Sequence, residues 1–153
     1  MPAMNIPLLS IPLYYLLSIY PHGRAISIST RGNLQTHDNR NPKSSSLASS
    51  IQKRLSASEF AAWERAESCH RNHLENMPLF VAAIFAGLLA EREVGRDLGT
   101  SKFAWAWLAT RVAYTVNYLR TESMKWTYLR SALYFLGTGL CFSMIGRAAL
   151  VLA

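Results

Sequence analysis

Residues 65–90 read RAESCHRNHLENMPLFVAAIFAGLLA, a dense polar block that runs directly into an apolar one. The apolar half, residues 77–90, has only 14 residues, whereas a helix that crosses a hydrocarbon core of ~30 Å needs about 20. A membrane span here must therefore include part of the polar half. It would bring four polar side chains to the membrane edge or just inside it: His70, Arg71, Asn72 and Glu75. Ionisable groups at that depth are costly and usually face the interior of a bundle, so this stretch predicts a functional site.

Apolar residues gather in four blocks, and the rest of the 153-residue chain is largely polar. Half of the residues are apolar while the mean hydropathy is only +0.08, because the apolar residues are confined to blocks at 6–20, 77–90, 103–119 and 131–146. The blocks are apolar around the whole circumference of a helix rather than along one stripe. This pattern predicts an all-α fold, a four-helix transmembrane bundle that forms one domain over residues 1–153. The alternative is a soluble four-helix bundle with a disordered insert.

The predicted helices cover residues of about 4–20, 58–91, 102–119 and 126–152. No basic residue precedes the first apolar block and no small-x-small cleavage site follows it. We therefore interpret this block as a retained membrane span rather than a signal peptide. Its tyrosines Tyr14, Tyr15 and Tyr20 suit the aromatic belt at a membrane surface.

Residues 21–57 are predicted to be a polar loop, because the segment is rich in Ser, Thr, Asn and Gly and cannot bury a core. The single acid in the segment, Asp38, stands against several basic residues: Arg24, Arg31, Arg40, Lys43, Lys53 and Arg54. The positive-inside rule places such a loop on the cytosolic face of the membrane. This loop accounts for most of the net charge of +7. No basic helix face is interleaved with aromatic residues, so we expect no nucleic-acid partner.

Cys69, His70 and His73 lie close together in the second predicted helix and could suggest a metal site. Zinc normally takes a second pair of ligands from another part of the chain, and the sequence has no suitably placed second pair. We therefore predict no metal site. The two cysteines, Cys69 and Cys141, both fall inside predicted helices and define no disulfide framework.

The second helix is predicted to begin with Ser58 as its N-cap and to carry a polar stripe into the membrane. Asn72 and Glu75 share this stripe, since they are three residues apart on a helix. Arg71 lies beside the stripe as the i, i+4 partner of Glu75. The alternative is that Arg71 and Glu75 form a solvated surface pair outside the bilayer.

Arg111 lies at the centre of the third helix, where a lone arginine is unfavourable by roughly 3 kcal/mol in a membrane. It therefore needs a partner or an anionic ligand. Tyr114 and Tyr118 share its helix face at i+3 and i+7, so two phenols line a path from the arginine toward the cytosolic end. Packing in the core is the alternative interpretation of the two tyrosines.

The fourth helix carries Arg130 and Ser131 in its first turns, where the arginine could hold an anion or simply extend to the membrane surface. Small residues further along would let neighbouring helices approach closely: Gly137, Gly139, Ser143 and Gly146. In the predicted topology, the polar residues of three helices fall into one layer of the cytosolic half: Arg71, Asn72, Glu75, Arg111, Tyr114, Tyr118, Arg130 and Ser131. Because three arginines face one glutamate, this layer suits a ligand with two carboxylates and one ammonium.

Seven positions of the second helix keep the spacing R-A-x-x-x-H-x-N-x-x-E-x-x-P-x-F: Arg65, Ala66, His70, Asn72, Glu75, Pro78 and Phe80. This pattern resembles the second helix of the membrane-associated proteins in eicosanoid and glutathione metabolism, the MAPEG family. The spacing of Arg111, Tyr114 and Tyr118 is similar to the third helix of the leukotriene C4 synthase branch of that family. Arg130, Ser131 and Tyr134 match the Arg-Ser-x-x-Tyr element of its fourth helix.

The resemblance implies a homotrimer in the endoplasmic reticulum membrane, with glutathione as cofactor and sites between neighbouring subunits. It implies a microsomal-type glutathione transferase or peroxidase whose lipophilic substrate arrives from the lipid bilayer. Glutathione also has the charge layout that the polar layer suits. The catalytic residues carried over are Arg130, which activates the thiol, with Ser131 and Tyr114. The binding residues carried over are His70, Arg71, Asn72, Glu75, Arg111 and Tyr118.

The spacing from Tyr118 to Arg130 is longer than in the prostaglandin E synthase branch, and Lys125 lies at the shorter spacing. Lys125 is therefore a second candidate for the cation that activates the thiol. Two other classes of function also stay open. One is a non-catalytic lipid-binding or scaffold protein of the same fold, and the other is a proton or ion pathway lined by the buried charges.

Overall fold

The computed structural model describes residues 4–42 and 44–153, so that residues 1–3 and Lys43 of the basic segment lie outside the described part. The described residues form helices and no strands, which confirms the all-α prediction. The elements are α1 (Ile6–Thr30), the 3-10 helix η1 (Leu34–Thr36), α2 (Ser45–Arg54), α3 (Ala57–Val94), α4 (Thr100–Arg120) and α5 (Met124–Val151). Four of them are long, and α2 is an additional short helix.

The polar segment 21–57 contains more helix than we predicted, because α1 continues to Thr30. Hydroxyl groups of this half of α1 donate hydrogen bonds back to the helix itself, for example from Thr30 Oγ1 to the Ile26 carbonyl at 2.8 Å. Ala25 and Ser29 are buried, and His22 Nδ1 lies 2.9 Å from Glu67 Oε1 on α3. Contact with α3 therefore keeps a polar stretch helical that would not be helical alone.

The rest of that segment is a short connection with a second helix in it. Asp38 fixes a turn, because its carboxylate accepts hydrogen bonds from the Arg40 side chain at 3.0 Å and from the Arg40 backbone N–H at 3.1 Å. These bonds lower the pKa of Asp38 to about 2. Ser44 then caps α2, which buries Ile51. The prediction of an unstructured loop over 21–57 is thus wrong for most of its length.

The N-terminus of α3 is fixed by a capping box that begins two residues earlier than we predicted. The Ser56 hydroxyl accepts from the Glu59 N–H at 3.3 Å, and the Glu59 carboxylate accepts from the Ser56 N–H at 2.8 Å. Ser56 rather than Ser58 is therefore the N-cap. The reciprocal glutamate at the third helical position makes Ser56 the better cap.

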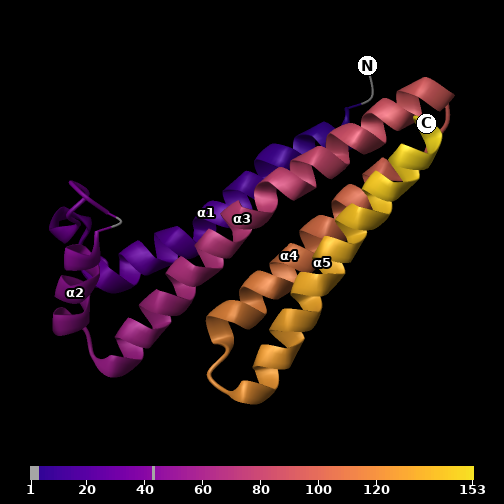
Figure 1. Cartoon of the computed structure of the whole chain (residues 1–153). Coiled ribbons are helices and arrows are strands. Elements are labelled where there is room, and N and C mark those ends of the chain that lie inside the picture. The colour runs from indigo at the N-terminus through magenta and orange to yellow at the C-terminus, as the bar shows by residue number, and fades with distance from the viewer. Residues whose placement is uncertain (1–3, 43) are drawn as a thin grey trace.

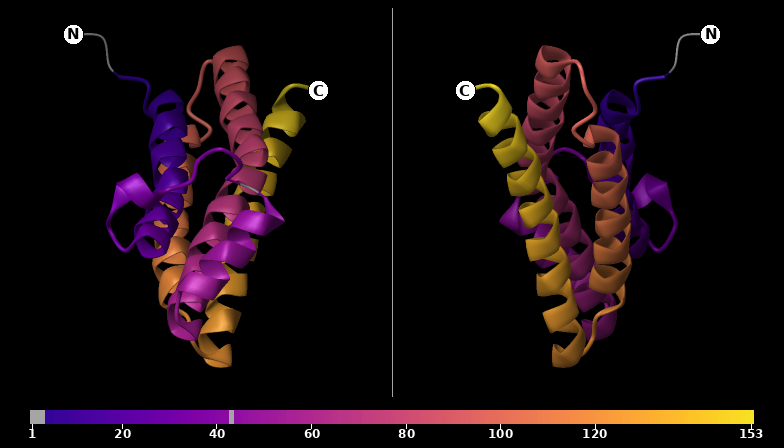
Figure 2. Two further views of the ribbon diagram at one scale, coloured as in Figure 1. Left: turned by 90° about the vertical axis from the view of Figure 1, so that its left-hand side faces the viewer. Right: turned by 90° about the vertical axis from the view of Figure 1, so that its right-hand side faces the viewer.

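The four long helices form two antiparallel pairs, α1 with α3 and α4 with α5 (Figure 1). The start of α1, the α3–α4 connection and the end of α5 lie together at one end of the molecule, which we call the α3–α4 end. At the other end, the α4–α5 end, the α1–α3 pair diverges from the α4–α5 pair and carries α2 on its outside. Figure 2 shows α2 lying along the outer side of α3.

Two helices of the described chain, α3 and α5, are long and apolar enough to cross a membrane. Large apolar side chains cover the outside of the bundle, since Phe135 is 70% exposed, Phe142 62% and Leu150 84%. Such a surface is unfavourable in water and suits lipid. Of the four membrane spans that we predicted, two, α3 and α5, are therefore supported directly by their length and hydropathy.

Tyr14 is at the centre of the core and not in a surface belt as we predicted. It is fully buried, and its ring packs edge-on against Phe80 and Trp107 with centroids 5.2 and 5.5 Å apart. Its hydroxyl lies 3.2 Å from the His73 carbonyl and 3.2 Å from His73 Nδ1. The reason is helix phase, since Tyr14 is on the face of α1 that meets α3 while Tyr15 and Tyr20 are exposed.

A buried polar chain joins three helices and sets the height of α4 against α3. Thr115 Oγ1 donates to the Arg111 carbonyl at 2.8 Å, and therefore accepts from His73 Nε2 at 2.8 Å. This leaves His73 Nδ1 as an acceptor for the Tyr14 hydroxyl. The arrangement places Arg111 opposite Asn72.

Of the small residues predicted to allow close helix contact in α5, Gly137 does so. A Cβ atom there would lie 3.2 Å from the Trp107 ring of α4. Gly139 and Gly146 have no neighbour within 4 Å and lie on the outer face of α5. Gly87 of α3 makes a still closer contact, since a Cβ atom there would lie 2.5 Å from Thr100 Oγ1.

Candidate functional site

Arg111 is fully buried and has no carboxylate partner among the described residues. Its Nη1 donates to Asn72 Oδ1 at 3.3 Å, and its guanidinium carbon lies 4.4 Å from the centre of the Trp107 ring. Tyr114 and Tyr134 flank it at 5.3 and 5.9 Å. The groups that surround Arg111 are thus one amide and several aromatic faces. Aromatic faces attract a cation but do not neutralise its charge.

Two donors of Arg111, Nε and Nη2, are buried and have no hydrogen-bond partner in the structure. Unpaired buried donors on a charged group are costly. A nearby anion would lower that cost. An anion bound next to this arginine would therefore be electrostatically favourable.

A cleft between α3, α4 and α5 opens directly beside Arg111. It has a volume of about 280 Å³ and is lined by Asn72, Tyr114, Tyr118, Arg130, Ser131, Tyr134 and Phe135. We call it the α3–α5 cleft. Every residue of this lining except Phe135 lies at a position that the sequence analysis had singled out. Chain segments far apart in sequence thus converge on one site.

The aromatic and cationic groups of the α3–α5 cleft touch one another. Arg130 extends over the Tyr118 ring, with its guanidinium carbon 4.5 Å from the ring centre. Tyr118 in turn packs against Tyr114 with centroids 5.5 Å apart. The phenol pair therefore connects Arg130, which lines the cleft, with Arg111, which lies behind Tyr114 and does not itself line the cleft.

Asn72 is oriented by its own helix. Asn76 Nδ2 donates to the Asn72 carbonyl at 2.8 Å and lies 3.5 Å from Asn72 Oδ1. Because Oδ1 also accepts from Arg111, the amide nitrogen of Asn72 is the atom left to donate to a ligand.

Lys125, the alternative cation, lies near the start of α5, is exposed, and does not line the α3–α5 cleft. Arg130 lies more than one helical turn further along and does line it. Within this chain, the geometry therefore favours Arg130 as the cation next to a ligand in the cleft.

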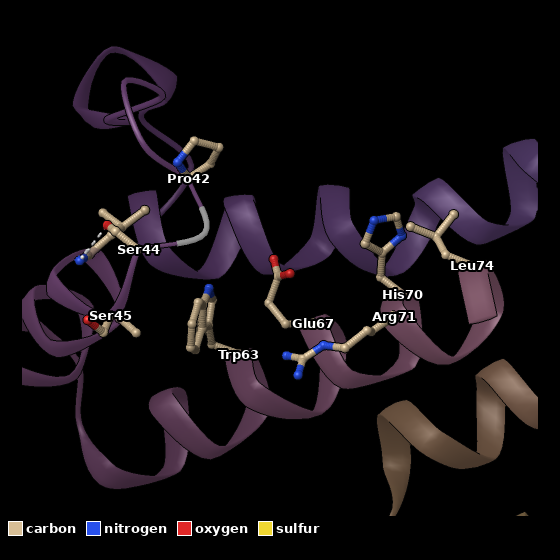
Figure 3. A pocket seen from close by; sticks show the side chains of 10 residues that line it. Pro42, Ser44, Ser45, Trp63, Glu67, His70, Arg71 and Leu74 are labelled. Atoms are coloured by element: carbon tan, nitrogen blue, oxygen red, sulfur yellow. Dashed lines mark hydrogen bonds between the residues drawn. The ribbon is translucent and has the colours of Figure 1, made fainter.

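His70 and Arg71 line a different cavity, on the side of α3 that faces α2 (Figure 3). It has a volume of about 470 Å³ and is lined by Pro42, Ser44, Ser45, Leu47, Ala48, Trp63, Glu67, His70, Arg71 and Leu74. His70 Nδ1 donates to the Ser18 carbonyl at 2.7 Å, and its ring stacks on His22 at 5.0 Å. The carboxylate beside these residues is Glu67, which is bonded to His22.

Glu75 is exposed and lines neither cavity. The expected ion pair with Arg71 is not formed in the described chain. Arg71 lines the cavity that faces α2, and Glu75 lies on the exposed outer face of α3. A ligand that touches Glu75, Arg71 and the α3–α5 cleft together must therefore lie at the outer surface of this chain.

The α3–α5 cleft continues into an adjoining cavity that the sequence analysis missed. This cavity has a volume of about 390 Å³ and is lined by Ala61, Glu64, Arg65, Ser68, Tyr118 and Arg130. Arg65 bridges to Glu122 across the opening at 3.3 Å. Ser68 and Glu64 precede Asn72 by four and eight residues, so helix periodicity alone could have identified them.

Comparison with known proteins gives one match. The family model described as the MAPEG family matches residues 5–150, nearly the whole chain, and bears out the resemblance seen in the helix patterns. It names the family and no branch of it. No curated protein and no solved structure matches the chain.

Proposed function

The chain belongs to the MAPEG family, and on that premise we propose that it is an integral membrane enzyme that binds glutathione in the α3–α5 cleft. The proposed reaction is transfer of the thiol to a lipophilic electrophile, or reduction of a lipophilic hydroperoxide. The observation that carries this proposal is the pair of unpaired donors on the buried Arg111, which packs behind the wall of a cleft that Arg130 lines. An anionic peptide fits that charge.

Binding rests on donors from three helices. The Asn72 amide nitrogen and the Tyr114 and Tyr118 hydroxyls face the cleft and can donate to carboxylates. Ser131 gives its proton to the Thr127 carbonyl at 3.2 Å, so its oxygen can accept from an ammonium or an amide. Arg111 adds positive potential from behind Asn72 and Tyr114.

Thiol activation is assigned to Arg130. When bound, glutathione supplies a thiolate nucleophile. A guanidinium beside the sulfur favours the charged form of the thiol and so raises the thiolate fraction at neutral pH. Tyr114 is the competing donor to the sulfur, since its ring lies between Arg111 and Tyr118 on the cleft wall.

The outward positions of Arg71 and Glu75 fit a homotrimer in which glutathione lies between subunits. In that assembly the outer face of α3 would complete the site of a neighbouring copy, with Glu75 facing the ammonium. The lipophilic substrate would enter sideways from the bilayer. We place the enzyme in the endoplasmic reticulum membrane with all four long helices spanning it.

The experiment that tests this function titrates the thiol of bound glutathione by its thiolate ultraviolet absorbance in purified, detergent-solubilised protein. In Arg130→Ala, the pKa of the thiol should return toward its free value of about 8.5 to 9, and turnover should fall while glutathione affinity changes little. Lys125→Ala is the matched control and should titrate like the wild type. Tyr114→Phe separates the phenol from the guanidinium, because the ring is retained.

If the pKa of the bound thiol stayed at its wild-type value in Arg130→Ala and rose in Lys125→Ala, thiol activation would be assigned to the lysine instead. Glutathione conjugation and peroxidase turnover should be measured on the same wild-type sample. Glutathione binding without any turnover would point instead to a non-catalytic lipid-binding or scaffold protein.

A further inference from the structure

A second groove lies between α4 and α5 at the α3–α4 end, well away from the α3–α5 cleft. It has a volume of about 270 Å³. From α4 it takes Gly99, Lys102, Phe103 and Ala106, and from α5 it takes Leu140, Ser143, Met144 and Arg147. We call it the α4–α5 groove. Nothing in the proposed glutathione chemistry uses any of these residues.

The interior of the α4–α5 groove is apolar. Phe103 and Met144 are buried residues of its lining, and Ala106 and Leu140 add further apolar surface. From Gly99 to Ala106 the groove follows α4 for about 10 Å. The small side chain of Ala106 leaves room that a larger residue would fill. A hydrocarbon chain lying between the helices would cover this surface.

The mouth of the groove carries two cations. Lys102 is exposed and forms no ion pair among the described residues. Arg147 is held over the mouth by hydrogen bonds from Nη1 to the Leu98 carbonyl at 3.4 Å and from Nη2 to Ser143 Oγ at 3.3 Å. Both of those bonds are to neutral oxygens, so neither positive charge is neutralised within this part of the chain.

Two acids at this end of the molecule accept hydrogen bonds from the backbone of the α3–α4 connection. Glu91 Oε1 accepts from the Leu98 and Thr100 N–H groups at 3.0 and 2.9 Å, and Asp97 Oδ1 accepts from the Gly99 N–H at 2.7 Å. The first turn of α4 contains no acid and has no side-chain cap. The lining of the groove itself contains two cations, Lys102 and Arg147, and no acid.

We propose that the α4–α5 groove binds a membrane lipid with a net negative headgroup. Its phosphate meets Lys102 and Arg147, and one acyl chain lies between α4 and α5 over Phe103 and Ala106. Two observations select this occupant. The apolar outer surface suits the helices to a bilayer, and the long Lys and Arg side chains near helix ends extend to the level of the lipid headgroups. The proposal does not depend on the glutathione chemistry.

The test measures lipid binding to the purified full chain by native mass spectrometry, with phosphatidylglycerol and phosphatidylcholine compared at equal concentrations. Wild type should retain phosphatidylglycerol at least about tenfold more tightly. The double variant Lys102→Gln and Arg147→Gln should lose that preference. Arg96→Gln, which removes a charge from the same end but not from the groove, should bind like the wild type.

Ala106→Phe keeps both cations and fills the groove, so it should weaken binding of both lipids by about tenfold or more. Unchanged phosphatidylglycerol binding in either the double variant or Ala106→Phe overturns the proposal. Competition by inorganic phosphate as effective as that by phosphatidylglycerol also overturns it, because the site would then hold a free anion. A change in oligomer mass in Ala106→Phe with lipid binding intact assigns the groove to a second copy of the chain and overturns it too.

Discussion

Arg111 shows how a single residue links sequence to site. Its central position in an apolar helix demanded a partner, and that partner is the Asn72 amide at 3.3 Å. An amide accepts a hydrogen bond from the guanidinium and leaves its positive charge in place, whereas a carboxylate would accept the hydrogen bond and also neutralise the charge. The charge available to an anion in the α3–α5 cleft therefore depends on position 72 being neutral.

Asn72→Asp tests this dependence with almost no change in shape. The new carboxylate should pair with Arg111, so the melting temperature should stay the same or rise. Glutathione affinity, measured by calorimetry, should fall by about tenfold or more because the cleft loses net positive charge. Asn117→Asp is the control, since it adds the same charge at a residue that does not line the cleft and whose Oδ1 already accepts from Thr121. Wild-type affinity in Asn72→Asp would show that Arg111 does not act on the ligand.

Individual residues also mark where prediction from sequence ended. The residues Asn72, Tyr114, Tyr118 and Arg130 come together in one cleft, because their spacings fix their helix faces. Glu75 does not join them. It was assigned to the same stripe as Asn72, yet three residues turn the side chain by about 60° around a helix, and that angle carries it from the edge of the cleft to the outer surface. Residue spacing in a sequence shows which side chains share a helix face. It does not show whether the surface that faces them belongs to the same chain or to a neighbouring copy.

At the scale of elements, the apolar helices were predictable and the polar ones were not. α4 and α5 begin and end within about two residues of prediction, because their apolar blocks have turn residues at both ends. The second half of α1 and all of α2 were missed. Their helical state comes from burial of Ala25 and Ile51 and from caps such as Ser44, whereas composition alone indicated a loop.

The closest helix approach predicts a stability change. In Gly87→Ala the new Cβ atom would meet Thr100 Oγ1 at 2.5 Å and Met144 Cε at 3.1 Å. We expect a loss of about 1–3 kcal/mol in the free energy of unfolding, measured by denaturation in mixed detergent micelles. Gly139→Ala is the matched control, because Gly139 has no neighbour within 4 Å. It should leave stability unchanged or raise it by up to about 1 kcal/mol. Equal effects of the two changes would contradict the packing of α3 against α4.

For the whole molecule, the arrangement of ends predicts membrane topology. α1 begins and α5 finishes at the α3–α4 end, and α2 lies at the opposite end (Figure 1). The excess of basic residues between α1 and α3 places α2 in the cytosol. In sealed vesicles, protease added outside should cut the α1–α2 connection and leave a C-terminal tag intact. A tag cleaved from the cytosolic side would contradict this orientation.

The divergence of the two helix pairs at the α4–α5 end has a mechanical consequence. Arg111 and Thr115 of α4 are hydrogen-bonded to Asn72 and His73 of α3, so the α4–α5 pair resembles a beam that is clamped at that height and free beyond it. Tyr118 lies on the free part and carries the Arg130 guanidinium on its ring. Beyond those hydrogen bonds, the ion pair that joins the two sides in the described chain is the exposed Arg65–Glu122 pair, which salt weakens. We therefore expect higher ionic strength to loosen this end of the molecule and to change the distance from the Arg130 guanidinium to the opposite wall of the cleft.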